Sequence, residues 1–353
     1  MAAGSRLASL VDRGVLRFME ARMSASAKRA VTIADPRAEL AQLAAAYSAG
    51  TLGLPSPFFP APAPIDPTLT PRGDGPLDTH VVDLAWRSDY APFHPAAREP
   101  YLAVVENATA HARWWTSDRG RPTIVLLHGW GGGNHWWGER TFEVAYWLRH
   151  GFDAVAFTLP FHGDRAPGIS GAMFPGPNPL RTNEAFGQAI YDLRALAAWL
   201  RARGSSAIGA MGMSLGGYTT ALWASLDPEL AFAIAMIPAV SMATLFWRHG
   251  EASPARRRAV SAGITEELLA DAFAVHAPTT RPVVIDRARR FVIAGRGDRI
   301  TPPDQAERLA AHWGVDVAWF DGGHLAQLGR RDVLRDVRRR LGELALPGRS
   351  FRG

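Results

Sequence analysis

The sequence has no cysteine, a single lysine (Lys28) and no apolar run that approaches the ~20 residues of a membrane span. Without cysteine the chain has no thiol nucleophile, no thiolate metal ligand and no disulfide. The N-terminus also lacks a compact apolar segment followed by small residues, so we expect no signal peptide and a cytoplasmic protein.

The basic side of the charge balance is almost entirely arginine. Lys and Arg number 39 against 33 Asp and Glu, a net charge of +6. The arginine clusters at 256–258, 287–290 and 338–340 are short, scattered and not interleaved with aromatic residues. They favour solvated faces over a nucleic-acid site, so we expect no nucleic-acid partner. The richness in Arg, Ala and Pro is typical of a GC-rich bacterial genome.

Hydrophobic residues make up 47% of the 353 residues and charged residues 20%, the proportions of a soluble globular protein. Hydrophobic residues at helical spacing predict an amphipathic helix over 5–23 and a second helix over 36–48. We expect these helices to pack on the protein's own core rather than on a membrane surface. The eight prolines of residues 53–76 predict an extended linker rather than sheet or helix. Residues 1–78 are therefore a helical and proline-rich N-terminal extension.

From residue 79 the chain predicts a sheet. Residues 80–86 and 108–116 alternate as antiparallel strands do, whereas 123–127 is a continuous apolar run typical of a parallel strand buried on both faces. Further strands are predicted at 153–158, 206–211, 230–236, 291–295 and 315–320. Helices are predicted between them, at 138–150, 183–203, 217–226, 303–313 and 325–343. This alternation predicts an α/β fold with a mostly parallel central sheet flanked by helices.

Two insertions interrupt the alternation. The loop 166–181 is rich in Gly and Pro, and 239–290 has a helical pattern without a sheet strand. Both follow the C-terminal ends of strands, the edge at which open α/β sheets bind ligands. They are lids or peripheral packing. We therefore divide the core into 79–238 and 291–353, with a lid or cap at 239–290.

The most informative motif is Gly212-Met213-Ser214-Leu215-Gly216, which lies between a predicted strand and a predicted helix. A serine at the tip of so sharp a turn presents its hydroxyl above the sheet edge. The flanking glycines are needed because a Cβ there would collide with the neighbouring chain. The alternative is an ordinary Gly/Ser turn.

Another glycine-rich turn, His128-Gly129-Trp130-Gly131-Gly132-Gly133, follows the 123–127 strand. Its backbone N–H groups can face a cleft and supply, beside the amide of Leu215, the second donor that an acyl-transfer site needs. A plain strand-to-helix turn is the alternative.

Two titratable residues follow later strands. Asp298 comes just after the 291–295 strand, and His324 follows two glycines after the 315–320 strand. A carboxylate in that place can hold an imidazole in one tautomer, and the imidazole can act as a base toward a serine. Taken singly, each is an ordinary loop residue. The evidence for a catalytic role is therefore the order Ser, Asp, His along the chain.

With these motifs in this order, residues 79–345 resemble the α/β-hydrolase superfamily. The resemblance implies Ser214 as nucleophile, His324 as base and Asp298 as acid. It implies oxyanion amides from Leu215 and from Trp130 or Gly131. Residues 1–78 lie outside it.

The segment Leu159-Pro160-Phe161-His162-Gly163 resembles a turn that lines the cleft of many superfamily members. His162 is a rival for the base, although it precedes Ser214 in the chain. Asp321 is a rival for the acid, although its place so near His324 makes an approach to the far ring nitrogen awkward.

We therefore expect a serine carboxylesterase-like hydrolase that uses neither cofactor nor metal. The substrate-binding residues we expect are Gly129, Gly131, Phe161, His162 and Met213. Trp130, Trp136 and Trp137 would add to an apolar cleft that favours an uncharged small-molecule ester, unless the last two pack in the core. An acyltransferase and a non-catalytic binding protein with this fold are the alternatives. The sequence does not fix the oligomeric state.

Overall fold

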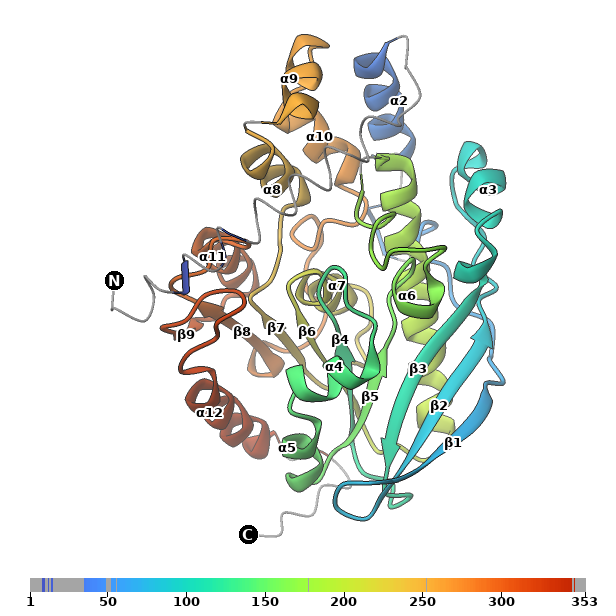
Figure 1. Ribbon diagram of the computed structural model, residues 1–353, viewed down its shortest axis with the longest axis vertical. Coiled ribbons are helices and arrows are strands. Elements are labelled where there is room, and N and C mark those ends of the chain that lie inside the picture. The colour runs from blue at the N-terminus through green and yellow to red at the C-terminus, as the bar shows by residue number, and fades with distance from the viewer. Residues whose placement is uncertain are drawn as a thin grey trace.

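A computed structural model of the chain describes residues 8–9, 12, 14, 35–48, 52–54, 56–176, 178–251, 253–344 and 346. Within this part of the chain nine strands form one sheet in the order β1-β2-β3-β5-β4-β6-β7-β8-β9 (Figure 1). The strands are β1 (Thr68–Gly75), β2 (Thr79–Arg87), β3 (Thr109–Thr116), β4 (Thr123–Leu127), β5 (Asp153–Phe157), β6 (Ile208–Met213), β7 (Ala233–Met236), β8 (Arg290–Gly295) and β9 (Val317–Phe320).

The sheet is antiparallel on one side and parallel on the other. The pairs β1–β2, β2–β3 and β3–β5 are antiparallel, and every pair from β5–β4 to β8–β9 is parallel. The predicted fold class, a mostly parallel sheet flanked by helices, is confirmed. The carboxyl ends of β4 to β9 consequently lie along one edge, where the predicted site residues follow their strands.

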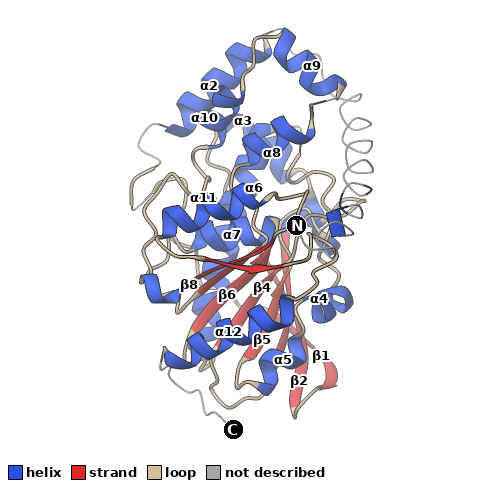
Figure 2. Ribbon diagram, turned by 90° about the vertical axis from the view of Figure 1, so that its left-hand side faces the viewer, coloured by secondary structure: helices blue, strands red, loops and turns tan. Residues whose placement is uncertain are grey.

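Helices cover both faces of the sheet (Figures 1 and 2). One face packs against α6 (Pro179–Ala202), α7 (Leu215–Trp223) and α11 (Pro303–Trp313), and the other packs against α5 (Val144–Arg149) and α12 (Arg330–Glu343). Alternate residues of the buried strands point to opposite faces of the sheet. Val125 and Leu127 belong to the first cluster, whereas Ile124 and Leu126 belong to the second.

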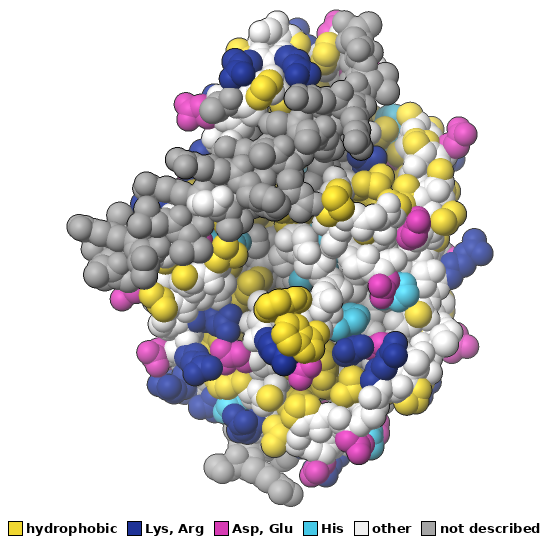
Figure 3. Space-filling view, viewed as in Figure 1, with side chains coloured by type: hydrophobic (Ala, Val, Ile, Leu, Met, Phe, Trp, Pro, Cys, Tyr) yellow, Lys and Arg dark blue, Asp and Glu magenta, His cyan; other side chains and the backbone are white. Residues whose placement is uncertain are grey.

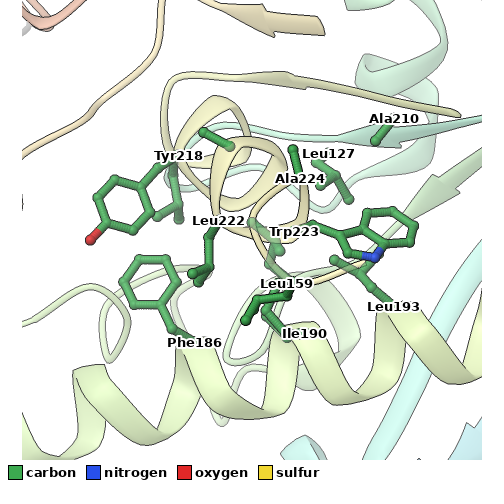
Figure 4. Packing of buried hydrophobic residues seen from close by; sticks show 14 of the residues in the cluster. Leu127, Leu159, Phe186, Ile190, Leu193, Ala210, Tyr218, Leu222, Trp223 and Ala224 are labelled. Carbon is green, nitrogen blue, oxygen red and sulfur yellow. The ribbon is translucent and has the colours of Figure 1, made fainter. Parts of the chain in front are cut away.

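The helix that follows Ser214 is buried along its whole length. Figure 4 shows Phe186, Ile190 and Leu193 of α6 turned toward Leu222 and Trp223 of α7. This packing holds α7, and with it Ser214 at the N-terminal end of the helix, against the centre of the sheet.

The described residues of the insertion 239–290 include the α-helices α8 (Met242–His249), α9 (Pro254–Ser261) and α10 (Glu266–Phe273). The helix α2 (Pro36–Ser48) of the N-terminal extension lies beside α10, as both views show. Leu40 and Ala44 of α2 form a small hydrophobic cluster with Ala272. The predicted helix over 36–48 is therefore present, and it packs on the insertion.

The N-terminal part differs from one prediction and covers only a little of another. The prediction that 53–76 contains no strand is wrong, because residues 68–75 form the edge strand β1. The edge position tolerates Pro71, which lies where the register with β2 shifts. Ala8, Ser9, Asp12 and Gly14 are helical, and most of the predicted helix 5–23 lies outside the described residues.

The predicted helix 138–150 is also wrong as one element, because it is divided into α4 (His135–Thr141) and α5. Glu143 stands between them with a left-handed φ of 49°. The predicted helix 325–343 begins later, at Arg330, after Gly329 in a left-handed conformation. The Gly- and Pro-rich loop ends at Asn178, whose side chain caps α6. The remaining helix, α3 (Pro95–Leu102), lies between β2 and β3.

Candidate active site

Ser214 stands at the turn between β6 and α7 in a strained conformation, with φ 56° and ψ −113°. Few residues other than glycine adopt a positive φ, and such strain persists where the surroundings impose it. Here the amide of Ser214 donates to Met236 O at 3.0 Å, and its carbonyl accepts from Tyr218 N at 3.0 Å. The turn is thus held by β7 on one side and by α7 on the other.

The two glycines of the motif have no room for a side chain. A Cβ on Gly212 would lie 2.0 Å from Gly216 O, and a Cβ on Gly216 would lie 1.9 Å from Leu127 O. These obstacles are backbone atoms, which cannot rotate away as a side chain can. The expected collision at both glycines is confirmed, and it explains why the motif needs glycine on each side of the serine.

The glycine-rich turn after β4 passes directly beside the serine. A Cβ on Gly129 would lie 3.4 Å from Ser214 Cβ. Leu215 is the first residue of α7, so its amide has no partner within the helix and lies at the positive end of the helix dipole. The amides of Trp130 and Leu215 therefore come from the two segments that meet at Ser214.

The turn after β4 is covered by the loop 166–178. Trp130 Nε1 donates to Gly171 O at 2.7 Å, and Ser170 Oγ donates to Gly132 O at 2.6 Å. The left-handed conformations of Gly131 and Gly133, with φ 76° and 98°, complete the turn. This loop therefore fixes the conformation of the segment that carries the candidate oxyanion donors.

The structure brings Asp298 and His324 together. Asp298 Oδ2 lies 2.8 Å from His324 Nδ1, and Asp298 is 1% exposed. Its other oxygen, Oδ1, accepts the amides of Ile300 at 2.9 Å and Thr301 at 2.8 Å. The carboxylate is thus held in one orientation, with one oxygen on its own loop and the other on the imidazole.

This contact governs the protonation of His324. Burial acts to lower the pKa of the imidazole, but the charge and hydrogen bond of Asp298, with a smaller contribution from Asp12, outweigh burial and raise the pKa above its ordinary value. Because Nδ1 faces Asp298, Nε2 is the ring nitrogen left for a reacting group. The contact goes to Asp298 and not to the rival carboxylate of Asp321.

Thr301 is a site residue that the sequence reasoning missed. Its hydroxyl lies 2.9 Å from Ile237 O, 3.0 Å from Asp298 Oδ2 and 3.1 Å from His324 Nδ1. Its single proton can go to Ile237 O or to Asp298. A hydroxyl three residues after a candidate acid, followed by proline, is the one signal in the sequence that could have indicated it.

The loop of His324 contacts the segment that carries Ser214. Gln327 Nε2 donates to His324 O at 2.9 Å and lies 3.8 Å from Met213 Sδ. Within the described residues no hydrogen bond joins Ser214 Oγ to His324. Such bonds are often long or poorly aligned in unliganded enzymes and tighten with bound substrate.

The two residues predicted from the segment 159–163 lie deeper than expected. Phe161 is fully buried and packs edge-on against Tyr101, with ring centroids 5.2 Å apart. His162 is also fully buried, and its Nδ1 lies 2.8 Å from Pro160 O. Burial and the neighbouring His128 hold the pKa of His162 well below its usual range. His162 therefore lies in the core, and among the described residues no carboxylate bonds to its ring.

Trp136 and Trp137 belong to α4 and are 52% and 63% exposed, so they are not core residues. Figure 3 shows hydrophobic side chains at the centre of the face drawn in Figure 1, over α4. Trp136 borders a surface hollow of about 820 Å³ between α4, α5 and α12. The residues that line this hollow include neither Ser214 nor Asp298 nor His324.

Across the described part of the chain, no three His, Asp or Glu side chains are grouped so as to hold a metal ion. In the same residues, no helix is both long and apolar enough to cross a membrane.

Comparison with known proteins adds relatives of similar sequence. A family model described as alpha/beta hydrolase fold matches residues 122–258. The chain is 30% identical over 309 residues to the uncharacterized protein MT2702 of Mycobacterium tuberculosis strain CDC 1551, a match that covers 84% of this chain and 72% of that protein. It is 30% identical over 304 residues to the uncharacterized protein Rv2627c of strain H37Rv, covering 83% of this chain and 71% of that protein.

Solved structures add relatives of similar fold. An acetyl xylan esterase from Paenibacillus sp. R4 superposes with a TM-score of 0.57 at 15% identity, covering 88% of this chain and 95% of that chain. Acetyl xylan esterase 1 from Thermoanaerobacterium sp. JW/SL YS485 gives 0.56 at 16% identity, with 80% and 89% covered. At these identities the likeness is one of fold.

Proposed function

Because the chain belongs to the α/β-hydrolase superfamily, we propose that it is a serine carboxylesterase-like hydrolase that forms an acyl-enzyme on Ser214. The observation that carries the proposal is the 2.8 Å contact between Asp298 and His324 at the sheet edge where Ser214 stands in its strained turn. A nucleophile, a base and a residue that orients the base are the three parts of such a site.

In the proposed reaction Ser214 Oγ attacks the carbonyl carbon of an ester while His324 Nε2 takes the hydroxyl proton. The carbonyl oxygen becomes negative and accepts hydrogen bonds from the amides of Leu215 and of Trp130 or Gly131. Asp298 favours the imidazolium that forms. As the tetrahedral intermediate collapses, the bond to the alcohol oxygen breaks and His324 gives that oxygen its proton. Water then attacks the acyl-enzyme by the same steps and regenerates Ser214.

The surroundings favour an uncharged acyl group. Trp130 and Met213 are partly exposed and adjoin the candidate oxyanion turn and Ser214. An acyl chain bound at Ser214 would therefore meet apolar side chains. We propose a small or medium apolar ester as the substrate class.

We further propose that residues 239–290 act as a lid. An exposed ion pair, Arg248 to Asp304 at 2.8 Å, joins α8 to α11, and such pairs contribute only about 0–1 kcal/mol. Hydrogen exchange of 239–290, measured before and after reaction with a long-chain fluorophosphonate, tests this. An exchange rate that does not change on labelling would argue for fixed peripheral packing.

The decisive experiment compares Ser214→Ala with wild type in fluorophosphonate labelling and in turnover of p-nitrophenyl esters of short and long acyl chains. We expect labelling to vanish and kcat to fall by at least about 10⁴-fold, because the nucleophile is removed. His324→Ala should lose nearly as much. Ser225→Ala is the matched control, since Ser225 is a buried serine just beyond α7 whose hydroxyl donates to Leu222 O.

The outcomes separate the alternatives. Undiminished ester turnover by Ser214→Ala would refute the assignment of the nucleophile. A wild-type protein that neither labels nor turns over esters would be a binding protein. Labelling with preferential transfer of the acyl group to an added alcohol over water would indicate an acyltransferase.

A further inference from the structure

A carboxylate from the N-terminal extension lies between the loops that carry Asp298 and His324. Asp12 is fully buried. Its Oδ2 accepts the amide of His324 at 2.8 Å and the amide of Arg299 at 3.1 Å, and its Oδ1 accepts the amide of Leu325 at 3.2 Å. One side chain therefore joins the residue after the candidate acid to the candidate base itself, across 287 and 312 positions of sequence.

A buried charge is retained only where its surroundings compensate it. An unpaired carboxylate in a protein interior costs several kcal/mol, whereas hydrogen bonds from backbone N–H groups to a charged acceptor are among the stronger ones. The three amides provide that compensation for Asp12. Conversely, these amides lie at the sheet edge away from any strand ladder, so removal of Asp12 leaves the N–H groups of both loops without this acceptor.

Neighbouring contacts show that both loops are shaped to receive this segment. Ser9 Oγ donates to Gly297 O at 2.7 Å, which adds a second bond to the loop of Asp298. A Cβ on Gly323 would lie 2.7 Å from Asp12 Oδ2 and 3.1 Å from Ala8 Cβ. Glycine before His324 thus permits the close approach of the N-terminal residues.

The charge of Asp12 also acts on the imidazole. Two carboxylates, Asp298 and more weakly Asp12, raise the pKa of His324 against the effect of burial. Among the described residues these are the charged groups whose interaction with His324 contributes to its shift. An imidazolium formed during a reaction is stabilised by both.

We propose that Asp12 is a positioning residue for the active site: it fixes the loops of Asp298 and His324 relative to one another and helps to stabilise the protonated imidazole. The proposal rests on the proposed function, in which His324 is the base. It extends the active site to the N-terminal extension, which precedes residues 122–258, the part that the family model matches.

Two substitutions separate the two roles. In Asp12→Ala all three hydrogen bonds to the carboxylate are lost. We therefore expect kcat for a p-nitrophenyl ester to fall about 10²-fold with KM changed less than about threefold, as when a base is displaced by ~1 Å. In Asp12→Asn the side chain keeps its shape and one carbonyl oxygen but loses its charge. We expect kcat to fall about tenfold, the size of effect seen when a supporting partner of a site residue is changed. Because the charge beside His324 is lost, we also expect the acidic limb of kcat/KM to move to lower pH.

Matched controls distinguish positioning from general damage. Asp66→Asn removes a charge from an exposed residue of the same extension and should leave kcat and the acidic limb at the wild-type values. Ser9→Ala removes one bond to the loop of Asp298 but leaves the three amides paired. It should lower kcat by less than threefold and leave the acidic limb in place.

A wild-type protein without esterase activity or fluorophosphonate labelling would overturn the proposed function and this inference with it. An active wild type whose Asp12→Asn and Asp12→Ala variants keep its kcat and its acidic limb would overturn the inference alone. Should Asp12→Ala fail to fold, Asp12→Asn decides, with an NMR titration of the His324 ring as a second readout. An unshifted ring pKa and an undiminished kcat in Asp12→Asn would both contradict the proposed role.

Discussion

The proposed nucleophile elbow, residues 212–216, and the proposed acid–base loops, residues 296–302 and 321–329, lie at the same sheet edge but are held by different contacts. In the elbow the constraints are backbone on backbone. A Cβ at Gly212 or Gly216 would meet a carbonyl oxygen at 2.0 or 1.9 Å, and Ser214 is bonded to β7 and α7 through its own main chain.

The acid–base loops depend on side chains instead. Asp298 bonds two amides of its own loop and the imidazole, Thr301 lies between Ile237 and Asp298, and Asp12 accepts amides from both loops. Few of these contacts belong to regular secondary structure. The geometry of the acid–base loops therefore depends on the identity of particular side chains, and single substitutions can change this geometry gradually.

The comparison indicates which part of the site can be tuned. Close-packed backbone has two states, intact or displaced, so the elbow tolerates almost no added volume. In a loop held by charge-assisted hydrogen bonds, each substitution removes particular hydrogen bonds or a particular charge and leaves the other contacts of the loop in place. We expect substitutions of the two elbow glycines to act on folding, and substitutions in the acid–base loops to act on kcat and its pH dependence.

Within the acid–base loops, the largest effect should come from Asp298→Asn. An asparagine can present its amide group to His324 Nδ1, which places the imidazole in the wrong tautomer for accepting a proton from Ser214. We expect kcat to fall by about 10⁴-fold with the fold retained, measured as p-nitrophenyl ester turnover beside a thermal melt.

Asp321→Asn is the control for that substitution, because Asp321 is an exposed carboxylate near His324 that does not hold its Nδ1. It should change kcat by less than about threefold, which is within the range of an ordinary surface substitution. If Asp321→Asn were the more damaging of the two, Asp321 would be the acid and the 2.8 Å contact of Asp298 would have another purpose.

The next effect, on stability, should come from Gly216→Ala in the elbow. The added Cβ meets Leu127 O of β4, so β4 or α7 must shift, and we expect the free energy of unfolding to fall by about 3 kcal/mol or more. Denaturant unfolding measures it. Gly138→Ala is the control, since nothing lies within 4 Å of its added Cβ in helix α4, and there alanine should stabilise by about 0.5–1 kcal/mol. Equal stability of the two variants would contradict the backbone argument.

The same contrast explains what the sequence could predict. The elbow follows from a local rule, namely a short apolar strand, two glycines around a serine, and a helix. The strand and the helix are both present, but the strand ends two residues later than predicted, at Met213, and the helix begins two residues earlier, at Leu215. The order of Asp298 and His324 along the chain predicted their approach because each follows a parallel strand. The predictions of the elbow and of the Asp298–His324 contact both depend on hydrophobic periodicity and on the positions of glycines, which can be recognised in a single sequence.

Contacts between distant side chains left no such signal. Asp12 reads as the polar face of an amphipathic helix, and only the folded chain shows that it is buried against His324. Two further features depend on neighbours in the same way. At the helix break, Arg330 bonds to the carboxylate of Glu143 at 2.7 Å. The strand at Pro71 depends on its position at the edge of the sheet. Local propensity predicted one helix and no strand because it does not include these partners.

The smallest effect is a shift in pH dependence that belongs to the acid–base loops alone. The pKa of His324 is raised above its ordinary 6.5, because Asp298 and Asp12 outweigh burial. A base must be neutral to accept a proton, so kcat/KM should be low in acid and rise with a midpoint above pH 6.5. By linkage, the charged His324 stabilises the fold fully below its unfolded pKa, and that stabilisation is lost as pH rises through the raised folded pKa. Profiles of kcat/KM from pH 5 to 9, about the span over which a histidine titrates, check this. Gly138→Ala should leave the midpoint where it is, whereas a wild-type midpoint below 6.5 would mean that burial outweighs the two carboxylates.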